Sequence, residues 1–329
     1  MRILFLSRWY PYPPNNGSKI RIWNLLRALG RRYDVTLVSF IDPAEETPDV
    51  GGLGGIVREV HTVPWREFNS GSLRALLGFL SPKPRWIVDT FSRQMADTIS
   101  QVLASQRYDL VIASQLIMGS YAAYFSGVTA LLEEVELGVY FQKQEQASNF
   151  LKKIRHSLTL IKLKFYLKSL LQHFCGYTVV SEQEKRLLNT MTDSGACVRI
   201  IPNCIDLDDY RNVQASLRKN SLIYAGSFRY DANYEAMEWF AGEVFPRILA
   251  VIPTAQLVIT GDSAGKSIGP DPHISQVGLV PDIRPLIASS MVSLAPLQTG
   301  GGTRLKILEA MALHSPVVAT SKGAEGLDV

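Results

Sequence analysis

The residues best placed to do chemistry lie near the C-terminus, where a run of glycines precedes two cations and a carboxylate. Glycines occupy 300–302, and the groups that follow them are Arg304, Lys306 and Glu309. An apolar run at 292–295 predicts a buried strand before the glycines. Free backbone N–H groups between a strand and a helix start, together with the helix dipole, attract anions. The spacing therefore predicts a phosphate site.

The helix expected after the glycines begins with charges of an unusual sign. Thr303 is a suitable N-cap, and apolar residues recur at helical spacing from Leu305 onwards. Arg304 and Lys306 fall in the first turn, where the dipole disfavours cations unless a diphosphate is bound there. Glu309 follows about one and a half turns later and is placed to reach beyond the phosphates of a ligand. On these residues alone, an ordinary glycine turn before a helix is an equally open interpretation.

The segment 300–312, GGGTRLKILEAMA, with PVVAT at 316–320, resembles the nucleotide-sugar signature of the family 4 glycosyltransferases, which are retaining enzymes of the GT-B fold. The resemblance implies that Glu309 binds the donor ribose and that loop amides and basic side chains bind the donor diphosphate. Gly301 stands where many relatives carry the first of two glutamates, a glycine-rich form that some subgroups share. The resemblance thus implies two sets of residues: catalytic Arg304, Lys306 and Glu309, and donor-binding Gly301, Gly302, Thr303 and Leu305.

Two earlier segments resemble other parts of the family's donor site. Gly226 and Ser227 end an apolar strand that faces the donor diphosphate in relatives, and Arg229 is the matching cation. Asp231 stands near the place of a second cation, which leaves the cations after the glycine run as the main neutralisers of phosphate charge. Val280 lies in GLVPDIRPLIASS, which resembles the segment whose backbone reads the nucleotide base.

The chain opens with a strand, loop and helix that are typical of a doubly wound fold. An apolar strand at 3–7 is followed by a loop with three prolines and by a helix expected at 19–29. The loop lacks the G-x-G-x-x-G of dinucleotide sites. The resemblance implies that it lines a cleft between two domains near donor phosphate and acceptor, with Gly17 and Ser18 as cleft residues. An ordinary surface loop is the alternative.

Three acids follow a central apolar strand of the first half, at the strand end where open α/β sheets bind ligands. Glu133, Glu134 and Glu136 are candidates to orient an acceptor hydroxyl, and Glu133 and Glu136 are the acceptor-side residues of the predicted site. The alternative, equally open, is that these acids cap the next helix through its dipole. Relatives often carry a sugar-contacting histidine nearby, where this chain has Ser114 and Gln115.

The segment 149–174 combines many cations with two apolar stripes at helical spacing. Its cations are Lys152, Lys153, Arg155, Lys162, Lys164 and Lys168, with no acid among them. One stripe is Leu151, Ile154, Leu158, Ile161 and Phe165, and the other is Leu160, Leu163, Leu167 and Leu170. A core needs one stripe, so the other could lie on an anionic membrane. Taken alone, the helix slightly favours packing on both sides with its lysines extending outward. The resemblance favours the membrane, because many relatives act on lipid-linked acceptors.

Composition describes an ordered chain of more than one domain. Its 329 residues exceed the usual size of one hydrophobic core, and 47% are apolar and 19% charged. A net charge of +4 is too small to indicate nucleic-acid binding. Cys175, Cys197 and Cys204 are scattered, which suits a reducing cytoplasm. The sequence lacks a long apolar run and begins directly with a strand, so we expect neither a transmembrane helix nor a signal peptide.

Alternating strands and helices predict parallel sheets covered on both faces. Strands are expected at 3–7, 35–40, 56–63, 110–113, 128–132, 176–180, 198–201, 255–260, 292–295 and 317–319, and helices at 19–29, 73–80, 89–104, 149–174 and 233–250. We expect a GT-B architecture, in which two Rossmann-like domains face each other across a cleft. Its parts are an acceptor-binding domain (1–203), a linker (204–220) and a nucleotide-sugar domain (221–329). Relatives continue for a further strand or two and a return helix, so we expect a C-terminally truncated domain.

The resemblance implies retaining, metal-independent transfer of a hexose from a UDP-, GDP- or ADP-sugar to a hydroxyl of a saccharide or lipid-linked acceptor. We expect no cofactor and no metal, because the D-x-D of Asp206 and Asp208 falls in the linker. The expected setting is polysaccharide or glycolipid synthesis in the cytoplasm, with peripheral contact at the inner face of the membrane. Two alternatives are an inactive nucleotide-sugar-binding or scaffold protein and a GT-B sugar-nucleotide epimerase.

Overall fold

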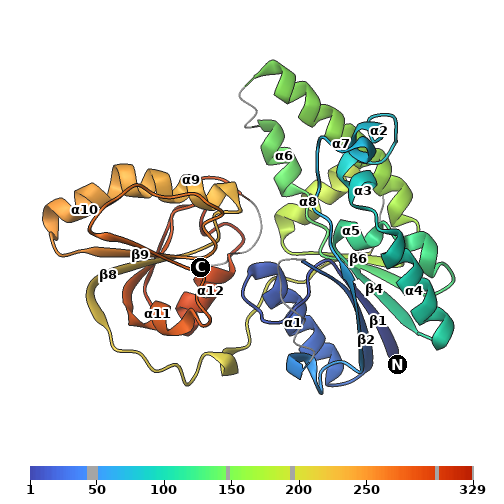
Figure 1. The fold of residues 1–329 in the computed structure, drawn as a ribbon, viewed down its shortest axis with the longest axis horizontal. Coiled ribbons are helices and arrows are strands. Elements are labelled where there is room, and N and C mark those ends of the chain that lie inside the picture. Colours follow the sequence, from blue (N-terminus) through green and yellow to red (C-terminus); the bar gives the residue numbers. More distant parts are fainter. Residues whose placement is uncertain (43–50, 146–148, 193–196, 301–303, 328–329) are drawn as a thin grey trace. The chain divides into compact units, whose positions relative to one another are not determined.

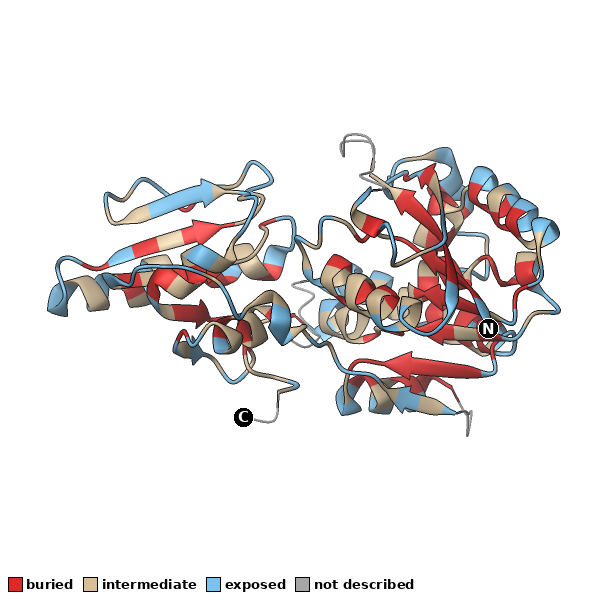
Figure 2. Ribbon diagram, turned by 90° about the horizontal axis from the view of Figure 1, so that it is seen from below, coloured by how far each residue is buried: buried red, intermediate tan, exposed pale blue. Residues whose placement is uncertain are grey.

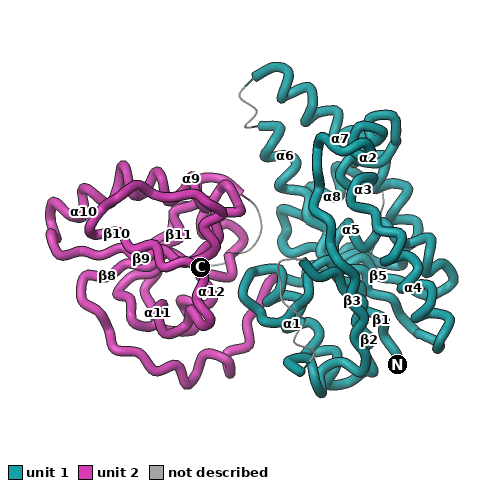
Figure 3. The backbone as a smooth tube through the Cα atoms, in the orientation of Figure 1, with its two compact units in different colours: residues 1–202 teal, residues 203–329 magenta. Residues whose placement is uncertain are grey.

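The computed structural model describes residues 1–42, 51–145, 149–192, 197–300 and 304–327. The chain divides into two compact units, 1–202 and 203–329 (Figure 3). Each unit is a parallel sheet with helices packed against it (Figure 1). The predicted class of two doubly wound α/β domains is therefore confirmed.

The first unit is built on a seven-stranded sheet with the order β3-β2-β1-β4-β5-β6-β7. Ile3 of β1 pairs with Val35 on one side and with Leu110 on the other. The first three strands are added outward from β1 in one direction and the last four outward from β4 in the other, so the strand order reverses between β1 and β4. Ligands of open α/β sheets bind at the carboxyl ends of strands beside such a reversal. The strands are β1 (Arg2–Ser7), β2 (Asp34–Ile41), β3 (Glu59–Pro64), β4 (Leu110–Ser114), β5 (Ala130–Glu133), β6 (Gly176–Val179) and β7 (Val198–Ile200).

Helices bury both faces of this sheet because successive strand residues point to opposite sides. Ile3 and Phe5 of β1 pack with α1 (Gly17–Gly30), whereas Leu4 and Leu6 belong to the core on the other face. That second core includes residues of α4 (Arg93–Ser105), α7 (Phe150–Leu171) and α8 (Glu182–Met191). The central strands are accordingly buried along most of their length (Figure 2).

The helix expected at 89–104 is wrong as a single element. The structure has two helices, α3 (Arg85–Thr90) and α4, separated by Phe91 and Ser92. Phe91 adopts an extended backbone with ψ 124° and stacks on Tyr121, while the Ser92 side chain accepts a hydrogen bond from the Met95 amide and caps α4. The remaining elements of the unit are η1 (Gly51–Leu53), α2 (Leu73–Leu77), α5 (Gln115–Gly119), η2 (Ala122–Phe125) and α6 (Gly138–Glu145).

The second unit repeats the plan on five strands, in the order β10-β9-β8-β11-β12. β8 begins at Arg218, inside the range expected for the linker. The strands are β8 (Arg218–Ala225), β9 (Gln256–Thr260), β10 (Ile274–Gly278), β11 (Ser290–Ala295) and β12 (Val317–Ala319). The helical elements are η3 (Leu207–Asp209), α9 (Asp231–Trp239), η4 (Phe240–Val244), α10 (Phe245–Val251), α11 (Arg284–Ser289) and α12 (Leu305–Ala312).

The long helix expected at 233–250 is present, but a π-helical turn interrupts it between α9 and α10. This turn, η4, lies immediately before Pro246, which occupies the first turn of α10. Proline has no N–H to donate, and its ring clashes with the carbonyl four residues earlier in a regular α-helix. A widened turn removes that conflict and lets the helix continue. α9 and η4 thereby keep Met237 and Phe240 in the core against β8 and β9.

Candidate functional site

Lys306 occupies a neutral pocket at the start of α12. Its Nζ donates to Tyr224 Oη at 3.0 Å and to Asn233 Oδ1 at 3.3 Å, and it lies 4.1 Å from the centre of the Tyr224 ring. Burial, together with the positive charge of Arg304, lowers the pKa of Lys306 to about 7, although the charge of Glu309 opposes this. An anion that reaches this ammonium therefore finds a cation whose nearest partners carry no charge.

A glycine at the end of β8 keeps the space beside Lys306 open, and a second glycine at the end of β9 lets the two strand ends approach each other. A Cβ atom on Gly226, directly after β8, would lie 2.9 Å from Lys306 Nζ and 3.0 Å from Asn233 Nδ2. Gly261, directly after β9, has a φ of +123°, and a Cβ there would lie 2.6 Å from the carbonyl oxygen of Gly226. Only glycine fits both the backbone angle and the close approach. Bare backbone at the carboxyl end of β8 thus lies next to a cation, and bare backbone after β9 packs against it.

Glu309 lies one turn beyond Lys306 on α12 and receives a hydrogen bond from outside the helix. Tyr210, in the segment after η3, donates from its hydroxyl to Glu309 Oε1 at 3.0 Å. Burial raises the pKa of Glu309, and the Tyr210 hydrogen bond, Lys306 and Arg284 oppose that rise. Tyr210 was not predicted from the sequence, because nothing in the composition of the linker indicates a partner 99 residues away.

Arg304 contacts Gly300, the first residue of the glycine run. Its side chain is buried, and Nη2 donates to the carbonyl oxygen of Gly300 at 2.6 Å. α12 begins at Leu305, which is also buried, and Arg304 is the residue that precedes the helix. Thr303, the N-cap expected from the sequence, is not among the described residues. The predicted donor contacts Gly301, Gly302 and Thr303 lie outside the described residues.

The loop after β8 is tied to the loop after β9. The Arg229 side chain is exposed and pairs with the carboxylate of Asp262, and this hydrogen bond lowers the pKa of Asp262. Ser227 Oγ accepts from the Arg229 amide at 3.2 Å and donates to the Asp262 carbonyl at 3.3 Å. Arg229 is therefore an exposed residue at the edge of the candidate site, and Asp262 holds its side chain in place.

Lys266 is a cation of this region that sequence reasoning missed. Its Nζ donates to Asp231 Oδ1 at 2.6 Å and lies 5.0 Å from the centre of the Tyr234 ring. Asp231 stands where relatives carry a second cation, and the fold brings a lysine to this acid from 35 residues away. No local pattern around Lys266 indicates that pairing.

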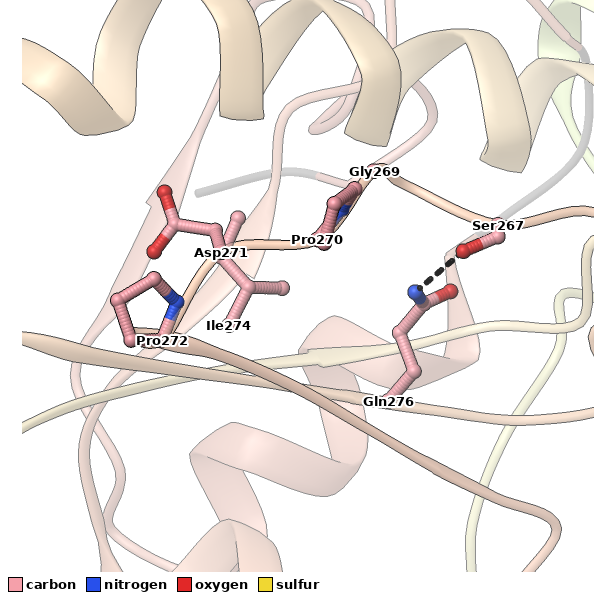
Figure 4. Close-up of a pocket in the computed structure, with 7 residues that line it drawn as sticks. All are labelled: Ser267, Gly269, Pro270, Asp271, Pro272, Ile274 and Gln276. Carbon is pink, nitrogen blue, oxygen red and sulfur yellow. Dashed lines mark hydrogen bonds between the residues drawn. The ribbon is translucent and has the colours of Figure 1, made fainter.

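Lys266 and the glycine-rich strand ends line a shallow hollow of about 260 Å³. Its lining includes Gly226, Gly261 and Gly278, one from each of the three adjoining strand ends. Val280, expected near the base, follows β10 and is half-buried. A wider hollow of about 560 Å³ adjoins it through Ser267 and Gln276, whose side chains are hydrogen-bonded at 3.1 Å (Figure 4).

In the first unit, Glu133 is committed to a buried ion pair. Arg21 of α1 reaches Glu133 Oε1 with Nε at 2.8 Å and with Nη2 at 2.6 Å, and Ser114 Oγ donates to Oε2 at 2.8 Å. Both carboxylate oxygens are thus engaged within the protein. Arg21 was absent from the predicted site, because its partner lies 112 residues away in the sequence.

Glu134 is the acid with the most perturbed surroundings in this cluster. Burial, then the charges of Glu133 and Glu136, raise the pKa of Glu134 to about 8, and Arg21 and a hydrogen bond from Gln115 Nε2 at 2.9 Å oppose the rise. Gln115 and Glu134 each directly follow a strand, and both have left-handed backbones with φ of 69° and 56°. Strained residues of this kind concentrate at functional sites.

The start of the next helix is capped by an acid from outside this cluster. Glu184 of α8 accepts hydrogen bonds from the amides of Leu137 at 2.7 Å and Gly138 at 3.0 Å, where α6 begins. Glu136 is half-buried in the loop before α6.

The other predicted cleft residues, Gly17 and Ser18, form the first turn of α1. They follow Asn16, whose side chain accepts a hydrogen bond from the Lys19 amide at 3.0 Å. Gly17 is exposed and Ser18 half-buried.

The D-x-D motif has a local structural role. Asp206 Oδ1 accepts the amide of Asp208 at 3.1 Å and caps η3. Within the described part of the chain, His, Cys, Asp and Glu side chains form no group of three that could hold a metal ion.

Two family models match the chain. The model described as Glycosyltransferase Family 4 covers residues 15–209, and the model described as Glycosyl transferases group 1 covers residues 219–328. An uncharacterized 44.6 kDa protein in the cps region of Klebsiella pneumoniae is 20% identical over 342 residues, covering 99% of this chain and 84% of that protein.

Solved structures share the fold over nearly the whole chain. Sucrose-phosphate synthase from Thermosynechococcus elongatus superposes with a TM-score of 0.65 at 18% identity, covering 99% of this chain and 82% of that one. Anabaena HepE in complex with UDP-glucose superposes with a TM-score of 0.60 at 14% identity, covering 99% and 81%.

Proposed function

Since the chain belongs to glycosyltransferase family 4, we propose that it is a retaining, metal-independent enzyme that transfers a hexose from a nucleotide-diphosphate sugar to a hydroxyl group. The acceptor is a saccharide or a lipid-linked saccharide. A relative encoded in a cps region supports a role in polysaccharide synthesis. The complex of HepE with UDP-glucose makes UDP-glucose the first donor to test.

The observation that carries this proposal is the surroundings of Lys306. A half-buried ammonium whose hydrogen-bond partners are neutral lies beside Gly226 at the end of β8, and α12 begins one residue before it. Cations, backbone amides and a helix dipole that converge on one place favour a diphosphate. Glu309, oriented by Tyr210, lies one turn further along the same helix and is proposed to accept the ribose hydroxyls.

The chemical demand of the reaction is to stabilise the negative charge that develops on the leaving diphosphate. Groups fixed before the donor arrives do this without reorganisation during the reaction. We assign that role to Lys306 directly. Arg304 is assigned a positioning role, because its guanidinium donates a hydrogen bond to the Gly300 carbonyl.

On the acceptor side, Arg21 and Ser114, the last residue of β4, fix Glu133 at the carboxyl end of β5. Both carboxylate oxygens of Glu133 already accept hydrogen bonds within the protein. Glu133 is therefore proposed to orient the acceptor site through its ion pair with Arg21. Glu136, Gly17 and Ser18 are proposed to line the acceptor approach.

The test is a thermal-shift screen with UDP, GDP, ADP and their common sugar conjugates. A ligand at one hundred times its Kd stabilises the native state by about 2.7 kcal/mol. We expect one nucleotide family to raise Tm, and we expect Lys306→Ala and Glu309→Ala to abolish the shift. Lys219→Ala is the matched control, because Lys219 is an exposed lysine at the amino end of β8, whereas Gly226 and Lys306 lie at the carboxyl end of that strand.

A second assay separates transfer from binding alone. Slow hydrolysis of the sugar from the stabilising donor, lost in Lys306→Ala, supports a transferase. Donor binding without hydrolysis or transfer to any acceptor supports a nucleotide-sugar-binding protein instead. A chain that no nucleotide stabilises would contradict the donor site itself.

A further inference from the structure

The helix α7 has one face without a partner in the described fold. Leu163, Leu167 and Leu170 are buried in the core of the first unit, so that stripe is the packed one. The other stripe is open: Phe150, Leu151, Ile154, Leu158, Ile161 and Phe165 are 77%, 78%, 40%, 55%, 52% and 65% exposed. Packing on both sides, which the helix alone slightly favoured, is therefore wrong.

A second exposed apolar segment lies beside this stripe. α2 and the turn after it expose Leu73, Leu76, Leu77, Phe79 and Leu80, the last of them to 88%. Lys162 of α7 joins the two segments, because its Nζ donates to the carbonyls of Gly78 at 3.0 Å and Phe79 at 2.8 Å. Figure 1 shows α2 next to α7 at the edge of the unit, with the N-terminal part of α7 extending beyond it. The α2–α7 surface is defined by these eleven side chains.

The α2 segment is held by buried polar anchors rather than by its leucines. The buried carboxylate of Asp89 accepts from Arg66 at 2.6 Å, from the Asn69 amide at 2.9 Å and from the side chain of Ser72, which caps α2. Arg85 donates to the Ala75 carbonyl at 2.8 Å. The leucines are therefore presented to solvent by a fixed backbone. An apolar surface of this kind marks an interaction site.

The charges around the stripe have one sign. At about 3.6 residues per turn, Arg155 and Lys162 border the stripe on one side, and Lys153, Lys164 and Lys168 border it on the other. Neither 150–171 nor 69–88 contains an acid, and the second range adds Arg74, Lys83 and Arg85. These positive charges also act on His156. Burial and the charges of Arg155, Lys143 and Lys152 lower its pKa.

We propose that the α2–α7 surface binds the face of an anionic lipid bilayer, with the apolar stripe entering the headgroup boundary and the flanking cations contacting lipid phosphates. An apolar stripe bordered by lysines is the pattern of a helix that lies in a membrane interface. No described helix is long and apolar enough to cross a bilayer. The inference rests on the first unit alone and does not depend on the proposed transfer reaction.

Vesicle flotation of the full chain tests the proposal. We expect binding to vesicles of phosphatidylcholine and phosphatidylglycerol in equal parts, and much weaker binding to pure phosphatidylcholine vesicles. The triple variant Leu151→Ser, Leu158→Ser, Phe165→Ser should bind at least about tenfold more weakly. The triple variant Lys153→Gln, Arg155→Gln, Lys164→Gln should lose roughly fivefold for each cation, and added salt should weaken binding of the native chain.

Two exposed apolar residues of the second unit provide the control. Leu217→Ser and Val251→Ser remove side chains that are 65% and 80% exposed, and they should leave vesicle binding unchanged. Equal binding to neutral and anionic vesicles would overturn the choice of an anionic bilayer. Light scattering without vesicles should give a monomer, and a dimer that Leu158→Ser dissociates would show that a second copy covers this surface. UDP-sugar binding measured on the same variants should stay intact, which separates this test from that of the donor site.

Discussion

At the scale of single residues, the chemistry of the second unit centres on one lysine in a neutral environment. Tyr224 and Asn233 hold its ammonium without offering a charge, and Arg304 disfavours its protonation. A diphosphate reverses that balance, because two negative charges close to the ammonium favour the protonated form. Donor binding is therefore expected to be coupled to proton uptake.

This coupling predicts that donor affinity falls as pH rises above neutrality. Without donor the pKa of Lys306 is about 7, and a bound diphosphate raises it. The affinity is thus fully present below pH 7 and declines between the free and bound pKa values, by up to about tenfold per pH unit. Titration calorimetry with a UDP-sugar, whose diphosphate charge is constant over this range, measures both the affinity and the proton uptake.

The control for this prediction is Lys306→Arg, because a guanidinium stays charged throughout the range. Its affinity for the donor should vary much less with pH and should show no proton uptake. A donor affinity of the native chain that stays constant from about pH 6.5 to about pH 9, a range that spans the pKa of about 7, would contradict the role given to Lys306.

At the scale of elements, the loops after β8 and β9 depend on a glycine pair. Gly261→Ala would place a Cβ 2.6 Å from the Gly226 carbonyl at a φ of +123°. We expect a loss of about 2 kcal/mol or more in unfolding free energy, together with weaker donor binding, measured by urea denaturation and calorimetry.

Substitutions at two neighbouring glycines distinguish the two causes of that loss, which are backbone strain and steric overlap with the Gly226 carbonyl. Gly265 has a φ of +76° and Gly269 does not have a positive φ, and a Cβ on either would meet nothing within 4 Å. Gly265→Ala should lose about 1 kcal/mol through backbone strain alone. Gly269→Ala should stay within about 0.5 kcal/mol of the native chain. If Gly261→Ala resembles Gly265→Ala, the close approach of the two loops is not a constraint.

Sequence patterns predicted the elements whose residues carry a regular apolar signal. The strands at 3–7 and 35–40 and the helix at 149–174 are present because their side chains are buried at strand or helix spacing. β10 was missed, since its residues Ile274–Gly278 are mostly exposed at the sheet edge and carry little apolar pattern. The break at Phe91 was missed because it depends on stacking with Tyr121, 30 positions along the chain.

The site was predictable only where its residues are neighbours in sequence. Lys306 and Glu309 share one helix, so their spacing placed them together before the fold was known. Tyr210, Lys266 and Arg21 reach the candidate sites from other elements, and local spacing carries no information on such contacts. The acids at and after the end of β5 were expected either to orient an acceptor hydroxyl or to cap a helix, whereas the partner that engages Glu133 lies 112 residues earlier.

At the scale of the whole molecule, each unit has a core of its own and a continuous stretch of sequence. We expect scanning calorimetry to resolve two transitions, with enthalpies near 60 °C of about 140 kcal/mol for 1–202 and about 90 kcal/mol for 203–329. A UDP-sugar that binds at the Lys306 site should raise the Tm of the transition with the smaller enthalpy. A single transition that carries about 230 kcal/mol would show that the units unfold as one.

The pair formed by Arg21 and Glu133 also bears on synthesis of the chain. The ribosome releases Arg21 long before the carboxylate that neutralises it, because 112 residues separate the two. Until β5 emerges, α1 cannot bury its guanidinium without a large desolvation penalty. In the nascent first unit, the face of β1 that α1 covers therefore stays exposed until the ribosome has supplied β5.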